Sequence, residues 1–358
     1  YVLGAITLYG QTSSITDVAQ GGWNAASATE ANGWSSVTYG NDKFVAFAVS
    51  GNNRVMYSTD ALNWSSASAT EANGWSSAIY GNDKFVAVSD TGNNRVMYSS
   101  DGINWSSTSA TEANGWYSVT YGDGKFVAVS YSGNNRVMYS SDGINWTAPS
   151  PPDANDWLSV TYGGGKFVAV AGSGTNRVIW SADGINWNAA SAAEANGWRS
   201  VTYGNDKFVA VAQDGTNRVM YSSDGISWSS ASAAENNSWR SVTYGDGKFI
   251  AVAKDGTNRV MWSADGINWN AASATEANGW FSVTYGNDKF VAVSYSGTNQ
   301  VMWSVSGQSD TVLTLTNNKD LGYFEVGDEV DDGATVTAIA PSVPSISVDG
   351  GTWAVGEV

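Results

Sequence analysis

Seven tryptophans recur along this chain at a constant spacing of 41 residues and divide most of it into equal copies. They are Trp34, Trp75, Trp116, Trp157, Trp198, Trp239 and Trp280. The copies share the sequence pattern W-x-S-V-T-Y-G-x-x-K-F-V-A-V, followed by a Gly/Asn loop, N-R-V-M-Y-S and S-D-G-I-N-W. A fixed period of this length indicates a repeat architecture, in which each copy buries its apolar surface against its neighbours.

Each copy predicts four short strands. In the third copy they cover 116–121, 125–130 and 136–140, and the fourth follows Trp146. Gly/Asn/Asp turns separate these apolar and aromatic runs, which is the signature of β-hairpins. Four antiparallel strands in about 40 residues, repeated, predict the blade of a β-propeller.

A second tryptophan series predicts that the ring closes. Its members are Trp64, Trp105, Trp146, Trp187, Trp228 and Trp269. One step of 41 back from Trp64 gives Trp23, whereas one step forward from Trp269 gives Asp310 and breaks the series. We therefore predict an all-β, seven-bladed propeller over 1–308, in which the N-terminal strand near Trp23 completes the last blade beside Trp303. Closure of this kind pairs two sheet edges that would otherwise be exposed. Both tryptophan series are interpreted as packing between blades.

Charge sets the last 50 residues apart from the repeats. The 358-residue chain has a net charge of −16, and residues 309–358 contain nine acids and one base. We predict a small acidic β appendage there, acting in docking or assembly. Its acids Asp328, Asp331 and Asp332 are of the type that binds Ca²⁺, but a solvated turn is the favoured interpretation, and no other cofactor is expected.

Composition excludes several classes of site. With no Cys and no His, the chain has no disulfide, no Cys/His zinc site and no Ser-His-Asp triad. The negative charge disfavours nucleic acids and anionic membranes as partners. No apolar run is long enough for a membrane span.

The turn Ser-Ser-Asp-Gly-Ile-Asn-Trp, at 99–105 and 140–146, resembles the Asp-box of sialidase-like (BNR) propellers. The family pattern, Ser-x-Asp-x-Gly-x-x-Trp, has one more residue between Asp and Gly. The resemblance implies a propeller fold over about 19–308 and a structural role for the turn aspartates. These are Asp60, Asp101, Asp142, Asp183, Asp224 and Asp265. The wording of the repeats, and that of the C-terminal segment, also resembles structural proteins of bacteriophage tails and virions, including those of cyanophages.

Equivalent residues in every copy argue against catalysis. Six arginines occupy the same position of the 41-residue repeat, with Gln300 in the seventh copy, and we call them the lattice arginines. They are interpreted as exposed side chains that pair with neighbouring acids. They are Arg54, Arg95, Arg136, Arg177, Arg218 and Arg259. Acids likewise recur four residues before each first-series tryptophan. Because a glycosidase needs two carboxylates in distinct environments, we predict that the protein is not an enzyme.

Two lattice positions vary strongly between copies. The residue after the first-series tryptophan is Ser35, Ser76, Tyr117, Leu158, Arg199, Arg240 or Phe281. The residue two before the Gly of the loop between the second and third strands is Val49, Asp90, Tyr131, Gly172, Gln213, Lys254 or Tyr295. In an up-and-down blade both positions lie on one face of the disc. Loops on a rigid scaffold commonly carry function, although exposed positions also drift.

We predict that this variable face binds a partner, a host-surface glycan or a protein. The candidate residues are Tyr117, Tyr131, Leu158, Arg199, Arg240, Lys254, Phe281 and Tyr295, a set suited to glycan stacking or to a protein interface. The sequence thus predicts a non-enzymatic, virion-associated structural or adhesion protein, located on a virion or outside the cell. Its other partners are expected to be virion or filament subunits, contacted through 309–358. The alternatives are a secreted bacterial lectin-like propeller and a sialidase-like glycoside hydrolase.

Overall fold

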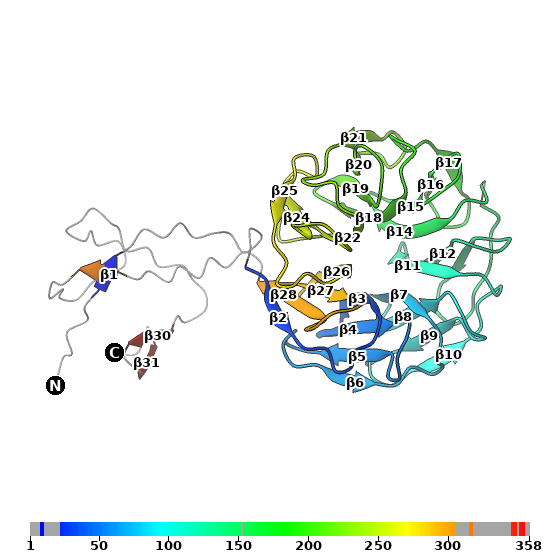
Figure 1. The fold of residues 1–358 in the computed structure, drawn as a ribbon. Coiled ribbons are helices and arrows are strands. Elements are labelled where there is room, and N and C mark those ends of the chain that lie inside the picture. The colour runs from blue at the N-terminus through cyan, green and yellow to red at the C-terminus, as the bar shows by residue number, and fades with distance from the viewer. Residues whose placement is uncertain are drawn as a thin grey trace. The chain divides into compact units, whose positions relative to one another are not determined.

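The described residues between 22 and 305 form a ring of antiparallel sheets (Figure 1). The computed structural model describes residues 8–10, 22–151, 153–305, 315–317, 345–348 and 351–354. Every regular element in these ranges is a strand. Within them, no helix is long and apolar enough to cross a membrane.

Seven blades make up the ring, and the prediction of a seven-bladed propeller is confirmed. The innermost strand of each blade begins at a first-series tryptophan. These strands are β3 (Trp34–Gly40), β7 (Trp75–Gly81), β11 (Trp116–Gly122), β14 (Trp157–Gly163), β18 (Trp198–Gly204), β22 (Trp239–Gly245) and β26 (Trp280–Gly286). The second strands are β4 (Lys43–Ala48), β8 (Lys84–Ser89), β12 (Lys125–Ser130), β15 (Lys166–Ala171), β19 (Lys207–Ala212), β23 (Lys248–Ala253) and β27 (Lys289–Ser294).

The outer strands complete the sheets. The third strands are β5 (Val55–Ser58), β9 (Val96–Ser99), β13 (Val137–Ser140), β16 (Val178–Ser181), β20 (Val219–Ser222), β24 (Val260–Ser263) and β28 (Val301–Val305). The fourth strands are β6 (Ser65–Ala67), β10 (Ser106–Thr108), β17 (Asn188–Ala190), β21 (Ser229–Ala231), β25 (Asn270–Ala272) and, in the last blade, β2 (Asn24–Ala26). The third blade has three strands, and only an isolated bridge between Tyr139 and Thr147 stands in for its fourth. The Pro-rich segment 149–152 that follows explains the loss, because proline cannot donate to a ladder.

Tight turns set the register of the inner hairpins. In the first blade, Asn41 and Asp42 connect β3 to β4 with φ angles of 44° and 55°. Two consecutive residues with positive φ match the right-handed twist of the flanking strands, and Asn and Asp tolerate this conformation best after Gly. Asn, Asp or Gly with positive φ occupies both turn positions in every copy, so one hairpin geometry is repeated around the ring.

The N-terminal strand closes the ring, as predicted. β2 pairs antiparallel with β28, placing Asn24 opposite Trp303 and Ala26 opposite Val301. Trp23 packs with Trp280 and Phe290 in one buried cluster. The two sheet edges that the sequence left unpaired are therefore paired with each other.

The blades are joined by apolar layers and by a repeated glycine–tyrosine contact. All seven first-series tryptophans are fully buried, which confirms their interpretation as core. Between neighbouring blades, a methyl group on Gly40 would overlap the ring of Tyr80, and one on Gly286 would overlap the ring of Tyr39. The last blade thus meets the first through the same contact that joins the blades in between.

Each turn aspartate organises its own loop. Asp60 accepts hydrogen bonds from the backbone N–H groups of Leu62 and Asn63, both at 2.8 Å, and from the hydroxyl of Ser58 at 2.9 Å. The backbone N–H of Asn63 is the main cause of the lowered pKa of Asp60. The other five copies repeat the pattern. The aspartates therefore fasten the turns between third and fourth strands.

The remaining described residues belong to a second compact unit, Tyr1–Ile15 with Asp310–Val358, whereas Thr16–Ser309 forms the first unit. In the second unit β1 (Leu8–Gly10) pairs with β29 (Leu315–Asn317), and β30 (Ser345–Val348) pairs with β31 (Gly351–Ala354). Asp328, Asp331 and Asp332 lie outside the described residues, so calcium binding there stays a prediction. The domain boundary at 308/309 and the docking role of 309–358 also stay predictions.

Candidate functional site

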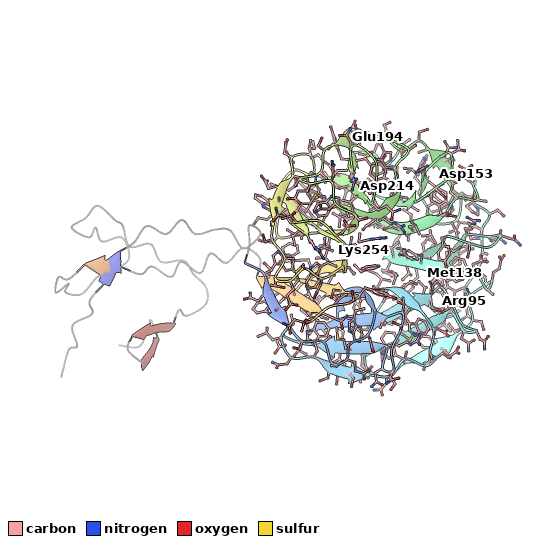
Figure 2. The ribbon with its side chains drawn as sticks, viewed as in Figure 1. Arg95, Met138, Asp153, Glu194, Asp214 and Lys254 are labelled. Carbon is pink, nitrogen blue, oxygen red and sulfur yellow. The ribbon has the colours of Figure 1, made fainter. Side chains whose placement is uncertain are left out.

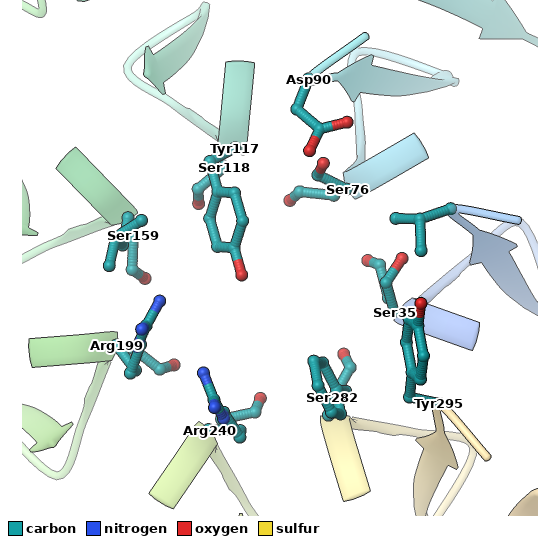
Figure 3. A pocket seen from close by; sticks show the side chains of 17 residues that line it. Ser35, Ser76, Asp90, Tyr117, Ser118, Ser159, Arg199, Arg240, Ser282 and Tyr295 are labelled. Atoms are coloured by element: carbon teal, nitrogen blue, oxygen red, sulfur yellow. The ribbon is translucent and has the colours of Figure 1, made fainter. Parts of the chain in front are cut away.

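A cavity opens at the centre of the ring, where the inner strands of the seven blades meet (Figure 3). Its volume is about 290 Å³. The first variable series contributes all of its members to the lining: Ser35, Ser76, Tyr117, Leu158, Arg199, Arg240 and Phe281. We call this space the axial cavity. One of the two positions that vary strongly between copies therefore lines one shared space in all seven blades.

A β-bulge turns these side chains toward the axis. In every blade the register between the first and second strands shifts directly after the tryptophan, for example between Trp34 and Ser36. The residue inside the bulge is the variable one. Bulges redirect a side chain away from the alternation of a regular strand. The tryptophan can thus stay in the core while its neighbour reaches the cavity.

Serine hydroxyls form the constant part of the lining. Seven serines two residues after the tryptophans line the axial cavity: Ser36, Ser77, Ser118, Ser159, Ser200, Ser241 and Ser282. Six of them accept a hydrogen bond from a valine N–H of the next blade at 3.0–3.2 Å, including the bond from Val37 to Ser282 that spans the closure. These bonds join the blades and leave polar oxygens around the axis.

One side of the axial cavity is cationic. Arg199 and Arg240 come from adjacent blades, and the Arg240 guanidinium lies 5.3 Å from the centre of the Phe281 ring. Arg199 donates from Nε to the amide oxygen of Gln213 at 2.8 Å. Arg240 Nε is buried without a hydrogen-bond partner. Burial lowers the pKa of Arg240, and the neighbouring Arg199 charge lowers it further.

The opposite side carries an acid. Asp90 and the Arg199–Arg240 pair face each other across the axial cavity (Figure 3). Asp90 is the one acidic residue of the lining. Burial raises the pKa of its carboxyl group. None of these three charged groups of the cavity belongs to an ion pair among the described residues.

Aromatic rings complete the rim. The Tyr117 ring meets Tyr131 edge-on with centroids 5.9 Å apart, and Phe281 lies 5.3 Å from Tyr295. Tyr295 is 44% exposed. The Tyr117 hydroxyl points into the cavity (Figure 3). Exposed or half-buried rings beside unmatched charges can stack on a planar ligand.

A second cavity of about 420 Å³ adjoins the first and shares Asp90, Tyr117, Leu158 and Arg199 with it. Gly172 lines it, and every other copy carries a side chain at this position. A methyl group at Gly172 would come within 2.6 Å of Leu158 Cδ1. The smallest member of the second variable series thus makes room beside the axis.

The eight predicted site residues fall into three groups. Six of them line the axial cavity: Tyr117, Leu158, Arg199, Arg240, Phe281 and Tyr295. Tyr131 lines the second cavity. Lys254 is exposed and lines neither, although it lies nearer the centre of the ring than Glu194 (Figure 2). Their role in binding stays a proposal.

Sequence reasoning missed two parts of the lining. Asp90 belongs to the second variable series, but the sequence alone does not distinguish a half-buried acid from a solvated one. The serine ring was missed because a residue that is constant between copies looked purely structural. For Asp90 the available signal was its unique acidic character within that series.

The lattice arginines were misinterpreted. They donate chiefly to backbone carbonyls rather than to acids: Arg54 Nη1 reaches Val49 O at 3.1 Å and, across the blade boundary, Asn73 O at 2.7 Å. Arg136 alone among the lattice arginines pairs with an acid in the described chain. Gln300 is buried and donates to Asn32 O at 2.8 Å, which joins the last blade to the first. A shorter neutral side chain satisfies the same carbonyl at the closure.

The acids that recur four residues before each first-series tryptophan also stabilise loops by accepting hydrogen bonds. Glu30 Oε1 accepts from the Asn53 side chain at 2.5 Å, and the backbone N–H of Asn53 donates to Oε2 at 3.3 Å. In the fifth blade, the equivalent hydrogen bond from the Asn217 side chain is the main cause of the lowered pKa of Glu194. Within the described ranges, no group of three or more Asp or Glu side chains is placed to hold a metal ion.

Comparisons with known proteins find the same fold in solved structures. A streptogramin B lyase superposes with a TM-score of 0.70 at 13% identity, covering 79% of this chain and 97% of that chain. Virginiamycin B lyase from Staphylococcus aureus gives 0.71 at 11% identity, with 80% and 99% covered. YCF48 from Cyanidioschyzon merolae gives 0.59 at 14%, with 79% and 98% covered. A scan against protein-family models finds no match, and neither does a comparison with curated proteins.

These neighbours correct two predictions. At such identities the likeness shows the fold, a β-propeller, and this fold includes two lyases. The prediction of a non-enzymatic, virion-associated adhesion protein is therefore wrong, as is the exclusion of enzymes on which it depended. The physical reason lies at the variable positions: they place unlike groups such as Asp90 and Arg240 around one cavity, so a repeated lattice does not preclude a unique site.

Proposed function

We propose that the axial cavity binds a small organic anion. The observation that carries this proposal is the Arg199–Arg240 pair, two adjacent guanidinium groups that line one cavity without a carboxylate partner. Burying a charge is costly unless it is paired. Guanidinium groups bind carboxylate, phosphate and sulfate groups through strong, charge-assisted hydrogen bonds. An anionic ligand would supply the charge that the protein itself lacks there.

The rest of the lining supports a ligand with a planar apolar part. Phe281, Tyr117 and Tyr295 place rings on the rim beside the arginines. The cavity volume of about 290 Å³ lies near the lower end of the range for small-molecule sites. The ligand would therefore be of the size of an aromatic carboxylic acid. An acidic monosaccharide belongs to the same chemical class, which is how the predicted carbohydrate binding would fit this site.

Calorimetric titration with 3-phenylpropionate and with glucuronate tests the proposal. We expect the wild type to bind at least one of them, and R199Q and R240Q each to weaken that binding about tenfold or more. K254Q is the matched control, since it removes one positive charge from the same face outside both cavities. Binding of neither probe, or equal losses in K254Q and R240Q, would contradict an anion site at the arginine pair.

A second candidate function is proton transfer on the bound ligand, favoured by the single half-buried acid of the axial cavity. Burial raises the pKa of Asp90, and perturbed acids in cavities are candidates for acid–base work. The virginiamycin B lyase has been solved as a catalytically inactive histidine-to-alanine variant with quinupristin. This chain contains no His, so that residue has no chemical equivalent here, and the transfer would fall to Asp90.

Mass spectrometry of the titrated ligands after incubation in D2O tests this second candidate, because a proton that is removed from the ligand and replaced from solvent is then replaced by deuterium. Incorporation of deuterium into a bound probe by the wild type, abolished in D90N while R199Q and R240Q lose binding, is the expected result. Recovery of every bound probe unchanged after long incubation would count against proton transfer on these compounds.

A further inference from the structure

Unmatched charges of opposite sign face each other in the axial cavity. The Arg199–Arg240 pair occupies one side and Asp90 the other, and the two sides come from different blades (Figure 3). At two repeated positions of the described ring, charged side chains have partners: the lattice arginines donate to carbonyls, and the turn aspartates accept backbone N–H groups. In the cavity Arg199 donates to Gln213, but none of the three charged groups pairs with a group of opposite charge.

Asp90 has a neighbouring cation that is used otherwise. Arg95, directly before the third strand of the same blade, donates from Nη1 to the backbone carbonyl of Asp90 at 2.8 Å and to Asn114 O at 2.7 Å. The Asp90 carboxylate lies near its own backbone N–H and is not within salt-bridge distance of any base among the described residues. Its carboxylate oxygens are therefore available to a donor on the ligand.

Charge complementarity then specifies the second end of the ligand. A carboxylate that is half-buried, lacks a cation and faces two arginines is best matched by an ammonium group. Resting on the anion site proposed above, we infer that the ligand of the axial cavity is a zwitterion of amino-acid type. Its carboxylate would lie at Arg199 and Arg240, its ammonium group at Asp90, and its side chain against the aromatic rim.

Comparison of the seven copies shows an acid at this position in the second blade alone. The equivalents of Asp90 in the other copies are Val49, Tyr131, Gly172, Gln213, Lys254 and Tyr295. None of them is acidic, so the negative charge is specific to the second blade. The loop itself does not require it, since the first blade pairs its second and third strands in the same register with Val49 in the loop.

Three probes that differ in single groups test the inference by calorimetry: L-phenylalanine, 3-phenylpropionate, which lacks the amino group, and L-phenylalaninamide, which lacks the carboxylate. We expect the wild type to bind phenylalanine at least tenfold more tightly than either analogue. In D90N, phenylalanine should lose at least tenfold, whereas 3-phenylpropionate should bind as before or more tightly. D246N is the matched control: it makes the same change in a turn where Asn41 and Asn82 stand in other blades.

Equal affinity for phenylalanine and 3-phenylpropionate, unchanged by D90N, would overturn the ammonium site while leaving the anion site in place. Failure of all three probes to bind the wild type would overturn the zwitterion site, and failure of glucuronate as well would overturn the anion site. A thermal melt confirms that D90N is folded. D90V, which carries the residue of the first blade, provides the same comparison if the amide variant is unstable.

Discussion

At the scale of single residues, the axial cavity contains groups that stabilise the fold poorly. Arg240 is half-buried, its Nε has no partner, and Arg199 lies close enough to lower its pKa. Fold stability alone would favour a neutral side chain, such as the serine of the first and second blades. Residues that cost stability at one shared cavity are typical of binding sites.

The variant R240Q should therefore be more stable than the wild type and bind anions less well. We expect its free energy of unfolding to rise by about 1 kcal/mol, because an unpaired buried charge is removed. R218Q is the control, since Arg218 donates to Asn237 O of the next blade at 2.8 Å and its loss should destabilise the ring. Urea denaturation measures both. A destabilised R240Q would show that this arginine is structural.

The turn aspartates predict how stability depends on pH. Backbone N–H groups of Asn186 and Ile185 hold the pKa of Asp183 well below its usual range. The folded pKa thus lies below the unfolded value of about 3.9. Such a group stabilises the fold above that pH, and the stabilisation is lost as the pH falls through the folded pKa.

We expect the thermal midpoint of the wild type to change little between pH 7 and pH 5 and to fall below about pH 4. D183N should melt lower than the wild type at pH 7, and the difference should shrink at pH 2. A difference that stays constant over this range would mean that the charge of Asp183 contributes nothing.

At the scale of elements, the inner hairpin is the unit that both builds and equips the ring. Its turn residues fix the register, and its bulge turns the variable residue toward the axial cavity. The glycine that ends its first strand, such as Gly204, leaves room for a tyrosine ring of the next blade. The glycine is required by the close approach of that ring rather than by its own dihedral angle.

Substitution G204A tests this packing. A methyl group on Gly204 would overlap the Tyr244 ring, and overpacking of this kind costs about 1–3 kcal/mol. G279A is the control, because its new methyl group would meet atoms at 3.5 Å or more, an ordinary contact. Equal urea midpoints for the two variants would contradict a tight blade boundary.

At the scale of the whole molecule, the ring is closed by the pairing of the N-terminal strand β2 with β28 of the last blade. A disulfide between N24C and W303C tests it, because these residues pair directly and opposed residues in antiparallel strands lie within disulfide range. The chain has no other Cys. Mild oxidation should change the mobility of the folded double variant on a non-reducing gel and raise its thermal midpoint. Absence of this crosslink, with single variants as controls, would argue against closure.

Much of this architecture could be predicted from the sequence because the repeat is nearly exact. The constant spacing of 41 residues predicted the seven blades, and Trp23, one step before Trp64, predicted that the N-terminal strand completes the last blade. The third blade departed because the prolines after Thr147 removed its outer strand. The site was predicted only in part: variability pointed to Arg240 and Phe281, but which charges stay unpaired depends on contacts between blades, and these have no signature within one copy.

Crystals soaked with 4-bromobenzoate test the anion site most directly, because bromine gives an anomalous signal that locates the ligand. We expect a bromine peak in the axial cavity, with the carboxylate within hydrogen-bond distance of the Arg199 and Arg240 guanidinium groups. An empty axial cavity, or a ligand bound only away from these arginines, would contradict it.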